Sequence, residues 1–195
     1  MNEIGIMKYS TILTVVATLC LGRVAGAAEP TAFALIKEGN NYVGVDVKDR
    51  VVEIRSDKSI GSLTPAIWHI VFYDPDATLK ATEVTFGAGK KMDVKRPVRL
   101  LEPVTGDQKE LDRKKMKVDS DKALKTATSE PLLEKLTVRA SQMWLQRGDA
   151  GPVWKVRLWA TKLKDPTKDV DIGDVYLSAE DGKVIRRDLH IDRVD

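Results

Sequence analysis

Alternating hydrophobic and polar positions dominate the chain after residue 28 and predict strands. The clearest case is residues 152–160, where Trp154, Val156 and Leu158 fall on one side of an extended segment and lysine and arginine fall on the other. This pattern is typical of an antiparallel sheet that is covered on one face and wet on the other. The same pattern and the turn residues between the runs predict eight strands, at residues 51–55, 65–73, 79–86, 92–98, 136–140, 152–159, 175–179 and 184–191.

Two short helices are predicted, one before each set of four strands. Ser120 is a favourable N-cap for a helix over residues 121–128, in which Leu124 and Ala127 lie on one apolar face. Residues 30–37 give a weaker helical pattern that ends at Gly39. The predicted fold class is therefore α+β, with each helix packed on a curved antiparallel sheet.

The order of elements occurs twice, which indicates a tandem duplication. The segments around Trp68 and Trp154 both open with a proline and continue as a strand, at a spacing of about 85 residues. We expect both tryptophans to anchor a core. The predicted organisation is a first α+β module at residues 29–103, a charged linker at 104–118 and a second module at 119–195.

Residues 1–28 have the pattern of a signal peptide. Lys8 precedes an uncharged apolar run at residues 11–22, which is too short to span a bilayer, and small residues follow it. We expect cleavage near Ala27 or Ala28, export to the periplasm or beyond, and no stable membrane insertion afterwards. Cys20, the single cysteine, lies inside this segment, so the processed chain would contain no thiol.

Three pieces of the second half form a recognisable series: a helix entry at residues 119–124, a strand at 151–158 and a strand–turn–strand ending at 175–185. In these pieces the chain resembles the PepSY family of small extracytoplasmic bacterial domains, although Ser178 or Ala179 occupies the position of the family's usual aspartate. The resemblance implies a cystatin-like fold without an active site. It also implies that the protein binds or inhibits a peptidase or another envelope protein.

Composition and motifs indicate a protein that is not an enzyme. The 32 basic and 29 acidic residues give a net charge of only +3, which does not suit a nucleic-acid binder. The two histidines, His69 and His190, are too few for a histidine-rich metal site, and no nucleophile elbow, phosphate loop or thiol motif occurs. We expect no cofactor. A small carboxylate-based enzyme remains an alternative, because paired acids have no fixed spacing.

The wet face of the second predicted sheet supplies the candidate binding residues. Trp159 and Tyr176 fall on this face by alternation, together with Arg157, and Trp144 is a further exposed aromatic candidate. Exposed aromatic residues mark interfaces, so a protein partner is expected, although a loop that covers these side chains would explain them equally well.

Two charged segments give further candidates. Asp169, Asp171 and Asp174 lie in a predicted acidic loop that could bind calcium or, with the concave sheet, a small ligand. A basic hairpin could bind an acidic partner, an anionic membrane surface or a glycan, or it could be an edge strand whose lysines oppose aggregation. The residues of this hairpin are Lys90, Lys91, Lys95, Arg96 and Arg99.

Overall fold

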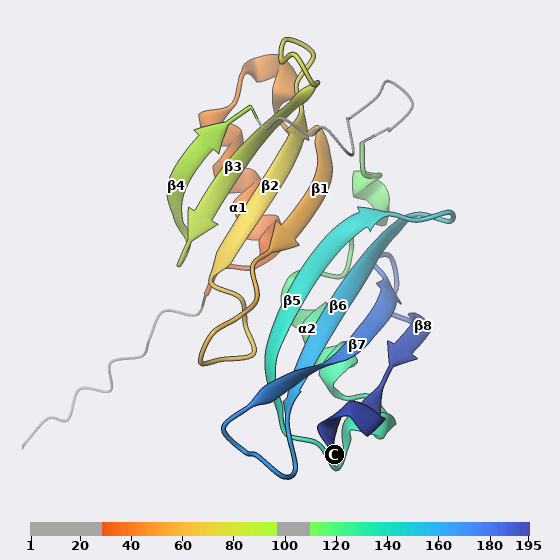
Figure 1. Cartoon of the computed structure of the whole chain (residues 1–195). Coiled ribbons are helices and arrows are strands. Elements are labelled where there is room, and N and C mark those ends of the chain that lie inside the picture. Colours follow the sequence, from red (N-terminus) through yellow and green to blue (C-terminus); the bar gives the residue numbers. More distant parts are fainter. Residues whose placement is uncertain (1–28, 97–109) are drawn as a thin grey trace, which may run out of the picture.

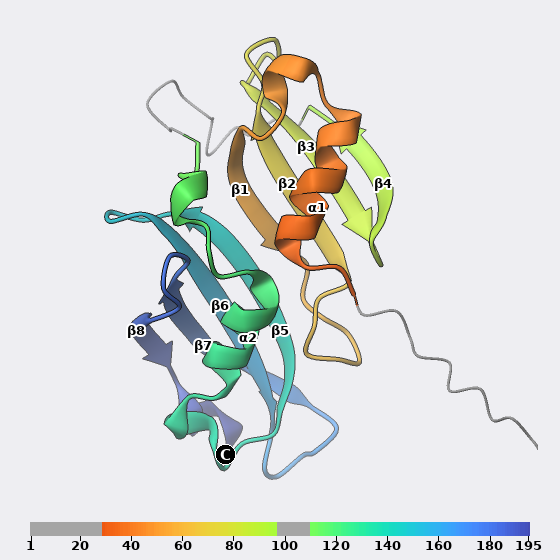
Figure 2. The same cartoon turned by 180° about the vertical axis from the view of Figure 1, so that it is seen from behind.

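The computed structural model describes residues 29–96 and 110–195, which form one eight-stranded antiparallel sheet and two α-helices. The strand order is β4-β3-β2-β1-β5-β6-β7-β8. Both helices lie on the same face of this sheet: the strands are in front of them in Figure 1, and the helices are in front of the strands in Figure 2. The predicted α+β class, with helices against an antiparallel sheet, is confirmed.

All eight predicted strands are present, and β5 and β7 are longer than predicted. The alternation of buried and partly exposed residues runs without a break along the whole of β6, as expected for a strand with one covered face. The elements are α1 (Ala32–Gly39), β1 (Val51–Ser56), β2 (Ile67–Tyr73), β3 (Ala81–Gly87), β4 (Lys90–Lys95), α2 (Ser120–Thr128), β5 (Val138–Arg147), β6 (Pro152–Thr161), β7 (Asp169–Ser178) and β8 (Val184–Leu189), with short 3-10 turns between them.

The core lies between the helices and the sheet, and both predicted tryptophan anchors are part of it. Trp68 and Trp154 are buried, which confirms that prediction. The Trp154 indole stacks on Phe33 of α1 with 6.3 Å between ring centroids, and its N–H donates to the carbonyl of Val118 over 2.8 Å. Trp154 belongs to the second half of the chain and Phe33 to the first, so the two halves share one hydrophobic core.

The two halves of the sheet are joined edge to edge, between β1 and β5. These strands pair through Ile54 with Leu145 and through Arg55 with Trp144. Serines extend the joint: the amide of Met143 donates to the Ser56 hydroxyl over 2.9 Å, and the Ser141 hydroxyl donates to the carbonyl of Leu63 over 2.6 Å. The helix-then-four-strands order does occur twice, but within one sheet, so the tandem modules stay a prediction.

The N-terminal ends of the two helices are also in contact. Helix α2 begins at Ser120, one residue earlier than predicted, and its N-cap is Asp119 rather than Ser120. The Ser120 hydroxyl instead accepts from the amide of Ala32 over 3.0 Å, and the Asp119 carboxylate accepts from the amide of Phe33 over 3.1 Å. The second half therefore caps the first helix, whose own N-cap residue Thr31 makes no side-chain cap bond.

Some predictions fall on residues that the structure does not describe. The predicted signal peptide, residues 1–28, lies outside the described residues, as do residues 97–103 of the first predicted module and 104–109 of the predicted linker. The rest of the predicted linker runs along the sheet. Within it, Leu111 is buried in the core, and its amide donates to the carbonyl of Val51 over 2.7 Å.

Candidate functional site

The face of the sheet opposite the helices carries a row of polar and aromatic side chains that crosses every strand. Residues that pair directly in an antiparallel sheet point to the same face. One residue from each strand continues this series of direct pairs across the sheet, and the pairing of β1 with β5 carries it from one half into the other. We call these residues the cross-sheet row: Asp93, Thr85, His69, Arg55, Trp144, Lys155, Tyr176 and Arg186.

In the second half of the row, each aromatic ring lies beside cations. The Lys155 ammonium is 5.2 Å from the centroid of the Trp144 ring and 5.9 Å from that of Tyr176. The Arg157 guanidinium is 5.8 Å from the Trp144 ring, and Arg186 is 4.0 Å from the Tyr176 ring. Attraction between a cation and the negative face of a ring stabilises such pairs and limits the motion of long side chains.

Asp174 fixes two of these cations from below. Its carboxylate accepts two bonds from Arg157, over 2.9 Å and 3.0 Å, and lies 3.3 Å from the Lys155 ammonium. The Asp174 side chain is only 7% exposed, so these cations compensate a charge that is almost fully removed from water. The hydrogen bonds to Asp174 raise the pKa of Arg157 against the smaller opposing effect of burial. These contacts restrict the conformations that Arg157 and Lys155 can adopt beside the Trp144 ring.

All four binding residues predicted from the sequence lie on this face and are partly exposed. Trp144, Arg157 and Tyr176 lie together, whereas Trp159 lies further along β6, where it pairs with Asp171. The Lys58 ammonium, from the loop between β1 and β2, is 4.5 Å from the Trp159 ring centroid. A loop that covers the exposed aromatic residues was the alternative to a binding surface. At Trp159, the loop between β1 and β2 does contact the ring, through Lys58.

The first half of the face holds a charged cluster around Glu83, which sequence reasoning missed. The Glu83 carboxylate contacts the guanidinium of Arg55, lies 3.1 Å from the Lys95 ammonium and is only 1% exposed. His69 lies between two carboxylates, with Nδ1 3.0 Å from Glu83 and Nε2 3.2 Å from Asp57. Both ring nitrogens therefore lie within hydrogen-bonding distance of a carboxylate oxygen.

The pKa of Glu83 reflects these contacts. Burial on its own acts to raise the pKa of this carboxyl. The hydrogen bond from His69 and the charge and hydrogen bonds of Arg55 and Lys95 outweigh burial and lower the pKa to about 2. Glu83 is therefore ionised throughout the neutral range and serves as the counter-charge for its neighbours rather than as an acid. Alternation along β2 and β3 could have predicted that His69 and Glu83 lie on one face of a sheet. It could not have predicted that this face continues to Trp144.

The acidic segment differs from the prediction. Residues 169–174 are the first part of strand β7 and not a loop, because they pair with the end of β6 from Asp169 opposite Thr161 to Asp174 opposite Arg157. Gly173 has a φ of +104°, and a Cβ there would lie 2.0 Å from the carbonyl oxygen of Asp188 in β8. In residues 29–96 and 110–195, no group of three histidine, cysteine or carboxylate side chains is arranged to hold a metal ion.

The remaining histidine and the basic hairpin lie elsewhere on the molecule. His190 is exposed near the end of the chain, 3.3 Å from Asp188. Lys90, Lys91 and Lys95 belong to the outermost strand β4, with Arg96 just beyond it, and Arg99 lies outside the described residues. Basic residues therefore gather along one edge of the sheet, as expected if they protect an edge or recognise an acidic partner.

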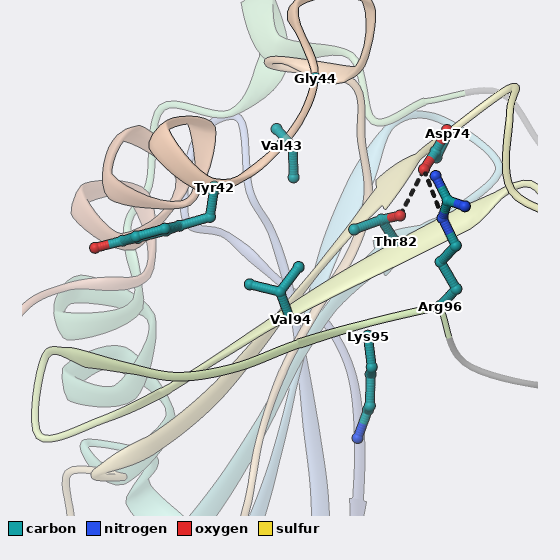
Figure 3. Close-up of a pocket in the computed structure, with 8 residues that line it drawn as sticks. All are labelled: Tyr42, Val43, Gly44, Asp74, Thr82, Val94, Lys95 and Arg96. Carbon is teal, nitrogen blue, oxygen red and sulfur yellow. Dashed lines mark hydrogen bonds and ion pairs between the residues drawn. The ribbon is translucent and has the colours of Figure 1, made fainter.

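A pocket of about 410 Å³ lies beside β4, between its inner side and the turn that follows α1 (Figure 3). Asp74 forms one end of it, where its carboxylate accepts from the Thr82 hydroxyl over 2.6 Å and lies 3.6 Å from the Arg96 guanidinium. Burial acts to raise the pKa of Asp74, but the hydrogen bond from Thr82 and the charge of Arg96 outweigh it and lower the pKa. Tyr42 and Val94 form the apolar part of the wall.

Comparisons with models of protein families, with curated proteins and with solved structures found no match for this chain. Among the described residues, neither α-helix approaches the length needed to cross a bilayer, since they contain eight and nine residues.

Proposed function

We propose that this protein is a non-catalytic binding module that recognises another protein through the open face of its sheet. The observation that supports this most strongly is the cross-sheet row, which passes through all eight strands and alternates aromatic rings with cations in its second half.

The composition of this face suits a protein interface. Tryptophan, tyrosine and arginine are the residues that most often dominate the energy of binding between proteins. Trp144, Tyr176 and Arg157 lie within one patch on three adjacent strands, and all remain partly exposed. Because Asp174 already orients Arg157, binding would cost less side-chain conformational entropy at Arg157 than it would if this side chain were mobile.

The geometry of the charged groups favours binding over catalysis. In the described part of the chain, both histidines lie against carboxylates, and Glu83 is ionised and held by cations. A general acid or base needs a pKa near the working pH and access to the substrate. Neither condition is met by Glu83, whose pKa is about 2 and whose side chain is 1% exposed.

We further propose that the chain consists of two PepSY-like modules, that it is exported, and that its partner is a peptidase or another envelope protein. The repeated order of one helix followed by four antiparallel strands supports the tandem arrangement. The resemblance of residues 119–185 to the PepSY family, and the signal-like pattern of residues 1–28, support the partner class and the compartment.

Affinity capture tests the proposal. The chain and a Trp144→Ala, Tyr176→Ala variant would be immobilised and exposed to a secreted or periplasmic extract. We expect the parent chain to retain a specific protein and the variant to retain at least tenfold less, because loss of two aromatic contacts at the centre of an interface costs several kcal/mol, roughly 2 for each hot-spot residue.

Leu132→Ala is the control, because Leu132 is an exposed apolar residue in the 3-10 turn that follows α2, outside the open face and away from β4. It should retain as much partner as the parent chain. Equal capture by the open-face variant, with its fold shown intact by circular dichroism, would refute the proposal.

A further inference from the structure

The outer edge of β4 is an open strand edge. Strand β4 is the last in the sheet, and within the described residues no strand pairs with its outer side. All six of its residues are exposed. The amide of Val94 donates over 2.8 Å to the carboxylate of the preceding Asp93, which is a local bond that an incoming strand could replace. An edge of this kind is a template for another extended segment.

Exposed apolar side chains accompany this edge. Met92 is 61% exposed, Val94 39% and Tyr42 38%, and Val94 and Tyr42 line the pocket of about 410 Å³ beside the strand (Figure 3). Strand addition gains affinity from main-chain hydrogen bonds and specificity from pockets that take alternate side chains. A pocket on one side of an open edge strand is the geometry that this mode of recognition uses.

The charge of the edge indicates the chemistry of its partner. Lys95 and Arg96 have their charges compensated by Glu83 and Asp74. In residues 29–96 and 110–195, no carboxylate forms an ion pair with Lys90 or Lys91, although Lys91 lies 5.4 Å from the ring centroid of Tyr42. Asp93 is the one acidic residue of β4, so the two lysines leave a net positive charge that is concentrated at the hairpin end of the strand. Two copies of β4 would bring lysines together, which disfavours pairing between copies of this chain.

We infer that β4 binds an extended acidic segment of a partner protein as a ninth strand, with one apolar side chain of that segment in the pocket between Tyr42 and Val94. Carboxylates of the segment lie opposite Lys90 and Lys91, and its backbone pairs with the outer edge of β4. This site is separate from the open face of the sheet, so the proposal for one site can fail while the proposal for the other holds.

A designed peptide tests this inference. The probe is a fluorescein-labelled nine-residue peptide with three consecutive glutamates at one end, which place carboxylates on both faces of an extended segment, followed by alternating valine and serine; its charge-reversed counterpart carries three lysines in place of the glutamates. We expect fluorescence anisotropy to show saturable binding of the acidic probe to the chain at low ionic strength, and at least tenfold weaker binding of the basic probe. Added salt should weaken the acidic complex, because exposed charges are screened.

Variants separate strand pairing from charge. Val94→Pro removes the edge amide and should abolish binding, whereas Val94→Thr keeps the amide and a similar shape and should retain it. The double substitution Lys90→Glu, Lys91→Glu, at two exposed positions, should weaken binding at least tenfold without unfolding the chain. Tyr176→Ala, on the open face, should have no effect. Absence of binding to the parent chain, equal binding of both probes, or full binding to the Lys90→Glu, Lys91→Glu variant would overturn the inference.

Discussion

At the scale of single residues, the open face depends on two nearly buried carboxylates. The Glu83 carboxylate in the first half contacts Arg55 and Lys95, and the Asp174 carboxylate in the second half contacts Arg157 and Lys155. A carboxylate that is removed from water is stable only when it is paired and hydrogen-bonded. Glu83 and Asp174 are both paired and hydrogen-bonded, and each restrains the longer side chains that contact it.

The lowered pKa of Glu83 makes folding stability sensitive to acid. In the unfolded chain the pKa of this carboxyl returns to its ordinary value near 4.5, whereas it is about 2 in the fold. The unfolded state therefore binds the proton more readily, so the contribution of Glu83 is fully present above pH 4.5 and is lost as the pH falls toward 2. The shift corresponds to roughly 3 kcal/mol.

Urea unfolding of the chain and of Glu83→Gln as a function of pH checks this prediction. We expect the variant to be less stable at neutral pH by roughly 2–3 kcal/mol and to lose less stability than the parent chain on acidification. Glu110→Gln is the control, because Glu110 forms an exposed ion pair with Arg50 and should change stability by less than about 1 kcal/mol. Parallel pH profiles for the parent chain and Glu83→Gln would contradict the prediction.

The alternation of residues along the sequence predicted which side chains are buried better than it predicted which side chains from different strands lie beside one another. Period-two patterning assigned Trp154 to the core and Trp159 and Tyr176 to the wet face, because the side-chain direction in a strand follows from the sequence alone. The burial of Glu83 could not be predicted in that way. It depends on Arg55 and Lys95, which come from other strands whose register the sequence does not specify.

At the scale of elements, the predicted strands all exist, and the differences lie at their ends. Residues 169–174 are rich in aspartate and contain a glycine, which is a loop signal in isolation. Pairing with β6 makes them part of a strand, and the close approach of the Asp188 carbonyl explains why Gly173 is needed there. The pairing supplies hydrogen bonds that outweigh a weak local preference for a turn.

Helix α1 depends on a cap from a distant part of the chain. Asp119 accepts both from the amide of Ser120, at the start of its own helix, and from the amide of Phe33 in α1. Sequence reasoning placed Ser120 as a local cap and could not foresee that the second half of the chain would cap the first helix. A short helix that lacks a cap of its own has unsatisfied amides, which must be compensated from elsewhere.

Asp119→Ala should therefore destabilise the fold more than loss of an ordinary cap. We expect a decrease of about 2 kcal/mol in the free energy of unfolding, at the upper end of the range for cap removal, measured by urea denaturation. Asp121→Ala, in the exposed first turn of α2, should cost about 0.5 kcal/mol. Equal effects of the two substitutions would show that the contact between Asp119 and α1 contributes nothing.

At the scale of the whole molecule, the joint between β1 and β5 is the feature that the sequence did not reveal. Two short antiparallel meanders were predicted as separate modules, but they form one sheet with both helices on one side (Figure 2). The joint rests on few residue pairs and on two hydrogen bonds between residues far apart in sequence: the Ser56 hydroxyl accepts from the Met143 amide, and the Ser141 hydroxyl donates to the Leu63 carbonyl. Contacts of that kind leave no periodic signal along the chain.

This joint gives the protein two different surfaces. It brings Arg55 beside Trp144, so that the open face becomes continuous across the sheet, and it places β4 and β8 at the two outer edges. The proposed protein-binding face and the proposed acidic-strand site on β4 therefore point in different directions. One molecule could engage both a broad partner surface and an extended segment.

Site-specific photo-cross-linking tests the central claim, protein recognition by the open face, most directly. A photoreactive benzoylphenylalanine would replace Tyr176 in one sample and Lys122, on the exposed side of α2, in another, and each would be irradiated in a secreted or periplasmic extract. The proposal predicts a discrete adduct with one protein from position 176 and none from position 122. No adduct from position 176, or equal adducts from both positions, would contradict it.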